Sequence, residues 1–328
     1  MIPSTMHALR ISAPTPASRA QLTHVPVPAV RPGWALVHVR GFGMNHSEKV
    51  LRDDEITCDY IAHPIIPGIE CVGHVADPSD TRFTAGQKVC ALMGGMGRNW
   101  DGSYAEYCLV PESHLFALPE AAAALPWEVL AAVPETFYTA WGSLLEGLHL
   151  APQDTLLVRA ASCGLGYAAL QIAHAHGCRA IATTHRPAYV PLLERFGADQ
   201  VILDREGVLA GSGVAVDKVL ELSGPATLND SLRLLRPGGI CCDTGILGGR
   251  ETLAGWDPIT AIPNGCYLTG FYSNSPTQQV IDALFTFVAQ QGIRPFVART
   301  FAFSELPRAL ALQDAGGFQG KLVVVNDR

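Results

Sequence analysis

The sequence lacks the features that mark three large classes of protein. Its 23 Lys and Arg residues are outnumbered by 30 Asp and Glu, so it has no basic excess of the kind that binds nucleic acid. No uninterrupted apolar run approaches the ~18–20 residues of a membrane helix. The opening residues MIPSTMHALR show neither the basic nor the apolar region of a secretory signal. Apolar residues make up 48% of the chain and charged residues 16%, which predicts a globular protein that binds neither nucleic acid nor membrane.

The nine cysteines form no recognisable disulfide or metal framework. Their number is odd, they are spread along the chain, and no C-x-x-C pair occurs. Several alternate with Val or Ile, as buried strand residues do. This usage is typical of a reducing compartment and predicts a cytoplasmic protein without structural zinc.

The hydrophobic pattern changes once along the chain, after Pro119. Before it, short apolar or alternating runs are separated by Pro and Gly turns, which predicts a mostly-β region. From about 125 to 275, apolar runs such as TLLVRA (155–160) alternate with helical stretches, which is typical of a parallel sheet with crossover helices. A last segment, with a helix at about 276–291, resembles the first region. The sequence therefore predicts an α/β chain in which a doubly wound parallel sheet accompanies a mostly-β domain.

A loop of small residues follows the first strand of the parallel-sheet region, within LLVRAASCGLGY (156–167). Small residues let the backbone approach a pyrophosphate, and the helix that opens at Gly164 offers N–H groups and a positive dipole end. The spacing A-x-x-G-x-G departs from G-x-G-x-x-G, because Cys163 stands where glycine is commoner. A tight turn without a ligand would have a similar sequence. The β-α-β context favours a dinucleotide site that includes Ser162, Cys163, Gly164 and Leu165.

The end of the next strand indicates which dinucleotide binds. NAD sites usually place an acidic residue about 20 positions past the glycines, on the ribose 2′-hydroxyl. Here Thr184 holds that position, and His185 and Arg186 follow without a nearby carboxylate. Hydroxyls and a cation suit a 2′-phosphate, so the sequence predicts NADPH; the alternative is that Arg186 is a solvated turn residue. Tyr189 is either a contact of the adenosine end or an exposed helix residue.

Motifs from both regions occur together in one known family. They are GFGMNHSE (41–48), PGIECVGHV (67–75), DGSYAEYCLVP (101–111), TAWGSL (139–144), FGADQV (196–201), RPGG (236–239) and GKLVVV (320–325). On these motifs the chain resembles the medium-chain dehydrogenase/reductase superfamily, in particular its zinc-free quinone oxidoreductase (zeta-crystallin-like) branch. The resemblance covers residues 6 to 325, although the formal quinone reductase signature is missed at Cys163 and His174.

The resemblance implies two domains and an assembly. A GroES-like, mostly-β catalytic domain is expected over 1–124 and 277–328. A Rossmann dinucleotide-binding domain, the doubly wound parallel sheet, is expected over 125–276. The strand region 264–272 lies where relatives pair their sheets, so we expect a homodimer.

The resemblance also allows catalytic zinc to be judged position by position. Zinc-dependent members carry Cys, His and Cys or Asp where this chain has Asn45, Ile69 and Glu135. Of these three, only Glu135 suits a hard metal, whereas a catalytic zinc needs three protein ligands. The segment 94–100 stands in place of the family's four-cysteine lobe. We therefore expect no bound metal.

Without zinc, the chemistry expected of the resemblance changes. The Lewis acid that supports alcohol oxidation is missing, so hydride delivery to a quinone or an α,β-unsaturated carbonyl is favoured. By resemblance, Asn45 lies near the nicotinamide as a positioning or oxyanion-donor residue. His46 is the candidate proton donor. Met93, Met96 and Trp100 either line the acceptor pocket or fill the lobe that lost its zinc.

The rest of the predicted coenzyme set comes from other elements. The resemblance assigns Thr139 to the nicotinamide ribose or the phosphates. Gly245, Ile246 and Leu247 follow a strand at the expected height of the nicotinamide, and Lys321 completes the set.

The predicted function is therefore an NADPH-dependent quinone or enone reductase. Two alternatives stay open at this point. One is a specialised biosynthetic enzyme similar to an enoyl reductase, and the other is an NADPH-binding sensor or structural protein without turnover.

Overall fold

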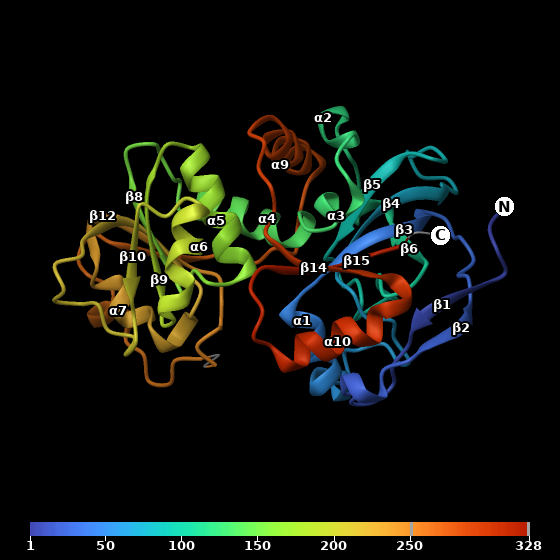
Figure 1. Cartoon of the computed structure of the whole chain (residues 1–328), viewed down its shortest axis with the longest axis horizontal. Helices are drawn as coiled ribbons and strands as arrows, with labels where there is room; N and C mark the ends of the chain where they lie inside the picture. The colour runs from blue at the N-terminus through green and yellow to red at the C-terminus, as the bar shows by residue number, and fades with distance from the viewer. Residues whose placement is uncertain (250–251, 327–328) are drawn as a thin grey trace. The chain divides into compact units, whose positions relative to one another are not determined.

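The computed structural model describes residues 1–249 and 252–326, and the chain divides into two compact units. Unit 1 comprises Met1–Glu135 and Asn274–Arg328, and unit 2 comprises Thr136–Ser273 (Figure 1). The sequence placed the first boundary earlier, at 124/125. The short helix α3 (Trp127–Leu130) belongs to unit 1 because it packs against the strands β3 (Trp34–Met44) and β15 (Lys321–Val325).

Unit 1 is mostly β. Besides β3 and β15, its strands are β1 (Thr5–Leu9), β2 (Leu22–Pro26), β4 (Glu70–Asp77), β5 (Lys88–Leu92), β6 (Tyr107–Pro111), β7 (Leu115–Ala117) and β14 (Val297–Ala302). β1 and β2 form an antiparallel pair. The others form a seven-stranded sheet in the order β14-β15-β3-β4-β5-β7, with β6 paired to β3. Only β14 and β15 pair in parallel within the described part of this sheet.

The helices of unit 1 cover parts of these sheets. Besides α3 they are α1 (His46–Asp53), α2 (Glu120–Ala123), α9 (Gln278–Gln290) and α10 (Leu306–Ala315). α9 lies beside α2 (Figure 1) and buries Ile281, Leu284, Phe285 and Val288, which share one face at helical spacing. α10 packs on β14 and β15 and adds its buried residues to the hydrophobic core of the unit.

Unit 2 is a doubly wound parallel sheet. Its strands are β8 (Thr155–Arg159), β9 (Arg179–Thr184), β10 (Gln200–Leu203), β11 (Val216–Glu221), β12 (Leu235–Asp243) and β13 (Tyr267–Gly270). They pair in parallel in the order β10-β9-β8-β11-β12-β13. This is the dinucleotide-binding order 3-2-1-4-5-6, so the predicted fold class is confirmed.

The connections of unit 2 are mostly helical. They are α4 (Pro134–Trp141), a π-helical turn over Gly142–Gly147, α5 (Gly164–Ala175), α6 (Val190–Arg195), α7 (Leu228–Leu232) and α8 (Pro258–Ala261). α5 packs on β8 and β9, and α7 packs on β11 and β12. No helix among the described residues is long and apolar enough to cross a bilayer.

Candidate functional site

The loop between β8 and α5 has the geometry of a tight strand-to-helix crossing. Cys163 is the N-cap of α5, and its Sγ accepts a hydrogen bond from Gly166 N at 3.3 Å. A Cβ on Gly166 would lie 2.1 Å from the carbonyl oxygen of Ala161, so only glycine fits there. A Cβ on Gly164 would meet nothing closer than Thr136 Cγ2, at 3.9 Å. Packing therefore requires glycine at Gly166, the second glycine of the motif, and not at Gly164, the first.

The same loop is held on the end of β9. Ala160 N donates to Thr183 Oγ1 and Ala161 N donates to the Thr183 carbonyl oxygen, each at 2.9 Å. Thr184 Oγ1 donates to Ser162 Oγ at 3.1 Å. The predicted loop residues, Ser162 to Leu165, are all half-buried. The structure thus brings the predicted phosphate loop and the predicted ribose-binding residue together.

The segment after β9 places a cation beside that loop. Thr184 is buried, whereas His185 and Arg186 are exposed. Arg186 N donates to Thr184 Oγ1 at 3.2 Å, its Nε donates to His185 Nε2 at 3.1 Å, and its Nη1 donates to Tyr189 Oη at 2.8 Å. The Tyr189 ring is half-buried, and the guanidinium carbon lies 5.4 Å from its centre.

One acidic residue near Thr184 is missed by reading the sequence. Asp204 follows β10, and its N–H donates to the Thr184 carbonyl oxygen at 2.9 Å. Its carboxylate points elsewhere, since Oδ2 accepts from Arg159 Nε and Oδ1 accepts from Gly207 N, both at 2.8 Å. Asp204 therefore lies next to Thr184, the predicted ribose-binding residue, while its carboxylate is bonded to Arg159 and Gly207.

The ends of α4 and β12 contribute a set of hydroxyl groups. Ser143 Oγ donates to the Thr139 carbonyl oxygen at 2.7 Å and lies 3.0 Å from Thr244 Oγ1. Thr139 itself is buried. Neither Ser143 nor Thr244 is singled out by the sequence, although each lies within four residues of a predicted site residue. The π-helical turn that carries Ser143 is a rare conformation, frequent at functional sites.

The three predicted residues after β12 differ in their constraints. A Cβ on Gly245 would lie 2.4 Å from the Leu222 carbonyl oxygen, so close backbone packing requires glycine. Ile246 and Leu247 are 47% and 53% exposed, which is unusual for large apolar side chains next to a buried sheet.

In unit 1, Asn45 is the centre of a buried polar network. Its Nδ2 donates to Glu70 Oε1 at 2.8 Å and to Glu48 Oε1 at 3.3 Å. Its Oδ1 accepts from the ammonium of Lys321, which also pairs with Glu70 Oε1 at 2.8 Å. Asn45 N donates to Glu48 Oε2 at 2.7 Å in the capping box that begins α1. The Asn45 side chain thus uses both amide hydrogens and its carbonyl oxygen inside the protein.

The carboxylates of this network are fully buried. Glu48 and Glu70 are each 0% exposed. Burial raises the pKa of Glu48 to about 7, although Lys321 opposes the rise. Glu70 Oε2 also accepts from Glu135 N at 2.8 Å. Lys321, which the sequence placed in the coenzyme set, is 6% exposed and lies in this buried ion pair.

The remaining predicted residues of unit 1 lie in different environments. His46 is the first residue of α1 and is exposed. Met96 is 1% exposed and belongs to the hydrophobic core, which favours the lobe-filling alternative for this residue. Trp100 packs against the same core, with its ring edge-on to Trp34 at 5.5 Å. Met93 is half-buried, with a φ of 61°.

The segment that contains these residues is fixed by Arg98. Its Nε and Nη2 donate to the two carboxylate oxygens of Glu55, at 2.9 and 2.7 Å, and Nη2 also donates to Ser47 Oγ at 2.8 Å. Arg98 therefore ties the segment to the first turn of α1. Across residues 1–249 and 252–326, no three His, Cys, Asp or Glu side chains are grouped to hold a metal ion.

Comparison with known proteins agrees with this architecture. The family model of the alcohol dehydrogenase GroES-like domain matches residues 31–120 of the sequence. The family model of the zinc-binding dehydrogenase matches residues 196–324. The quinone oxidoreductase of Rattus norvegicus is 26% identical over 316 residues, covering 92% of each chain. Polyketide synthase GfsB of Streptomyces halstedii is 27% identical over 97% of this chain, which spans only 6% of that protein's length.

Solved structures share this two-unit fold over nearly the whole chain. The crystal structure of AibC superposes with a TM-score of 0.88 at 25% identity, covering 99% of this chain and 97% of the other. Bacillus subtilis protein yhfP, solved with NAD bound, shares the fold with a TM-score of 0.83 at 23% identity, covering 98% of this chain and 100% of the other. The fold and the matched domains define an oxidoreductase architecture. The chain belongs to the medium-chain dehydrogenase/reductase superfamily, with quinone oxidoreductases among its relatives.

Proposed function

We propose that the protein is an NADPH-dependent oxidoreductase that delivers hydride to a quinone or an α,β-unsaturated carbonyl without catalytic zinc. The observation that carries the proposal is the β8–α5 loop. Its half-buried residues Ser162 to Leu165 surround the start of a twelve-residue helix, where N–H groups and the helix dipole favour a pyrophosphate. Gly164 has room for a Cβ in this chain, so a ligand close to the backbone is a physical reason for glycine there.

The surroundings of Thr184 support NADPH over NADH. The carboxylate of Asp204 accepts from Arg159 and Gly207, so it does not supply the acceptor that a 2′-hydroxyl needs. The exposed guanidinium of Arg186 offers charged donors to a 2′-phosphate. Tyr189 holds that guanidinium through its hydroxyl and would position it.

The coenzyme supplies the hydride when bound, and the protein fixes its geometry. The proposed contacts on the nicotinamide side are Thr139 and the residues Gly245 to Leu247. Asn45 acts as a positioning residue, because its amide hydrogens are already donated to Glu48 and Glu70 and are not free for an oxyanion. His46 is the proposed proton donor, since it is an exposed imidazole adjacent to Asn45.

Absence of zinc is part of the proposal, and the residues present support it. Where two oxygen atoms converge, on Asn45 and Glu70, the chain places the ammonium of Lys321. A cation in that position repels a metal ion. Elemental analysis of the purified protein tests this point, and a stoichiometric amount of zinc would contradict it.

The proposal extends to location and assembly. All nine cysteines are free thiols, which suits a reducing cytoplasm. β13 lies at the edge of the described sheet of unit 2, and Tyr267 on it is 60% exposed. An unpaired strand edge of this kind can pair with a second copy, so we propose a homodimer.

A specialised biosynthetic enoyl reductase is the second candidate. It is favoured by the match of nearly the whole chain to segments of polyketide synthase GfsB and of the squalestatin tetraketide synthase of Phoma sp.. The chemistry would be the same hydride transfer to an unsaturated carbonyl, with a different carbon skeleton.

An acceptor screen tests the proposed function. Purified protein is mixed with NADPH and a panel of quinones, enones and enoyl thioesters, and the loss of NADPH absorbance is followed. We expect oxidation that depends on a quinone or an enone. Turnover confined to enoyl thioesters would favour the biosynthetic enzyme. Binding of NADPH without oxidation by any acceptor would favour a sensor or structural protein.

A further inference from the structure

The last residue of β8 is a buried arginine in an otherwise uncharged strand. Arg159 is 1% exposed, and the four residues before it, Thr155 to Val158, are buried and carry no charge. A buried ion pair is weak evidence for a contribution to stability, since well-packed apolar residues of similar volume often serve as well. The position of Arg159, directly before the proposed phosphate loop, suggests another reason for the charge.

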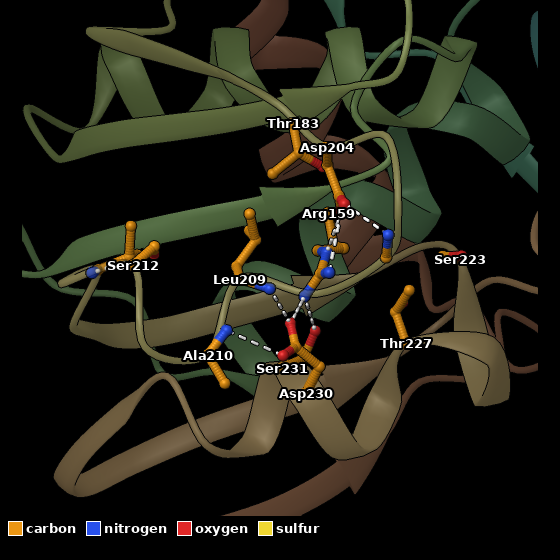
Figure 2. A network of polar contacts seen from close by, with 12 residues as sticks. Arg159, Thr183, Asp204, Leu209, Ala210, Ser212, Ser223, Thr227, Asp230 and Ser231 are labelled. Carbon is orange, nitrogen blue, oxygen red and sulfur yellow. Dashed lines mark hydrogen bonds and ion pairs between the residues drawn. The ribbon is translucent and has the colours of Figure 1, made fainter.

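Arg159 holds two carboxylates that are distant in the sequence. Figure 2 shows its guanidinium between Asp204 and Asp230. Nε donates to Asp204 Oδ2 at 2.8 Å, and Nη1 donates to Asp230 Oδ2 at 2.7 Å and to Ser231 Oγ at 3.2 Å. Nη2 also lies 2.8 Å from Asp204 Oδ2. The guanidinium thus joins the end of β8 to α7 and to the loop after β10.

The two carboxylates in turn hold the backbone of that loop. Asp230 accepts from Leu209 N at 2.8 Å and from Ala210 N at 2.9 Å, and Asp204 accepts from Gly207 N at 2.8 Å. Burial favours a higher pKa for Asp230, but these two N–H groups and Arg159 together hold the pKa below its usual value. Asp230 is therefore ionised at neutral pH, and the segment 204–210 is fixed through charged groups.

The network reaches the predicted 2′-phosphate site through the backbone. Asp204 N donates to the Thr184 carbonyl oxygen at 2.9 Å, so the residue that Arg159 holds by its side chain is bonded to the end of β9. Thr184 Oγ1 in turn contacts Ser162 Oγ and Arg186 N, at 3.1 and 3.2 Å. Only Asp204 separates Arg159 from Thr184 along this chain of contacts.

We propose that Arg159 is a positioning residue for coenzyme selectivity, which keeps the Asp204 carboxylate away from the 2′-position and fixes Thr184 for a 2′-phosphate. The proposal rests on the proposed NADPH site. A site held in its binding arrangement before the ligand arrives loses less free energy on binding. A carboxylate released next to Thr184 would repel a phosphate and would accept a hydrogen bond from a ribose hydroxyl. Arg159 therefore favours NADPH indirectly, by holding Asp204, and does not itself contact the phosphate.

Calorimetric titration of variants with NADPH and with NADH tests this role. In R159M the carboxylate of Asp204 loses its cation, and the ratio of NADH to NADPH dissociation constants is expected to fall about tenfold. In the double variant R159M/D204N the released carboxylate is gone, and most of the ratio is expected to return. A purely structural role would weaken both coenzymes equally and would not be rescued by the second substitution.

R236M is the matched control. Arg236 Nη1 forms an ion pair with Asp217 Oδ2 at 2.8 Å in the same unit, but the side chain is 45% exposed. This pair lies at the amino-terminal ends of β11 and β12, whereas Arg159 lies at the carboxyl end of β8. In R236M the ratio of NADH to NADPH dissociation constants should equal that of the wild type. An unchanged ratio in R159M, an equal fall in R236M, or no recovery in R159M/D204N would each overturn the proposal.

A second variant covers the case in which R159M does not fold. R159K keeps one positive charge but has a single ammonium for two carboxylates, so the ratio is expected to fall about threefold. An unchanged ratio in R159K would then overturn the proposal. Absence of binding of either coenzyme by the wild type would overturn the proposed function as well, whereas an unchanged ratio in a variant that binds overturns this inference alone.

Discussion

A buried network of charged groups lies in each unit, and the two networks differ in which parts of the backbone their carboxylates hold. In unit 1, Asn45 binds the carboxylates of Glu48 and Glu70, and Lys321 pairs with Glu70. These carboxylates also accept three backbone N–H groups, which come from three separate segments at Asn45, Ile69 and Glu135. In unit 2, the carboxylates held by Arg159 also accept three backbone N–H groups of one loop. The first network fastens strand and helix ends together, and the second sets the position of a loop.

The two networks also differ in the charge states of their carboxylates. The pKa of Glu48 is raised to about 7 by burial, so its carboxyl group gains and loses a proton near neutral pH. The pKa of Asp230 is lowered despite its burial, because backbone N–H groups and Arg159 favour the ionised form. We therefore expect substitutions in unit 1 to change stability and its pH dependence, and substitutions in unit 2 to change coenzyme binding.

The largest expected effect on stability is that of K321M. Methionine removes the ammonium that faces Glu70 and Asn45, and an uncompensated buried carboxylate costs about 3–5 kcal/mol. Urea denaturation followed by circular dichroism measures the loss. K49M is the control, since Lys49 pairs with Asp53 at a partly exposed site and contributes less than about 1 kcal/mol. Equal losses in the two variants would contradict the account.

The next effect is the pH dependence caused by Glu48. Its pKa rises from 4.5 to about 7 on folding, so the folded protein holds this proton more tightly than the unfolded chain. The contribution to stability therefore falls as the pH rises from about 4.5 to 7, by about 3 kcal/mol at most. In E48Q this part of the slope should disappear. The free energy of unfolding of both proteins, measured across that range, checks the sign, and parallel curves would contradict it.

The smallest of these effects concerns Arg186 in unit 2. R186A removes the exposed charged donor next to Thr184 and should weaken NADPH binding by about 1.5–3 kcal/mol while NADH binding stays nearly constant. R179A is the control, because Arg179 lies at the opposite end of β9. Titration calorimetry measures the dissociation constants of both coenzymes. An unchanged preference would overturn the 2′-phosphate assignment without touching the pyrophosphate site.

Local patterns predicted the fold and the loop because both depend on neighbours in sequence. The alternation of strands and helices indicated the parallel sheet, and the small residues before Gly164 indicated the crossing into α5. The partners of Arg159 were not predictable in this way, since Asp204 and Asp230 lie 45 and 71 residues away. The only sign of this network in the sequence was a charged residue, Arg159, at the end of the apolar run LLVR.

The role of Asn45 shows the same limit. Its amide oxygen accepts a hydrogen bond from Lys321, which is 276 residues away, and no spacing rule reveals that contact. Met96 was open to two interpretations because a methionine in a glycine-rich loop suits a pocket wall and a core equally well. Burial favours the core, since Met96 is 1% exposed and belongs to the hydrophobic core of unit 1.

Calorimetric titration of the unmodified protein with NADPH and with NADH measures the coenzyme preference itself. We expect both coenzymes to bind, with NADPH as the tighter ligand. Heat from neither coenzyme, or tighter binding of NADH, would contradict this expectation.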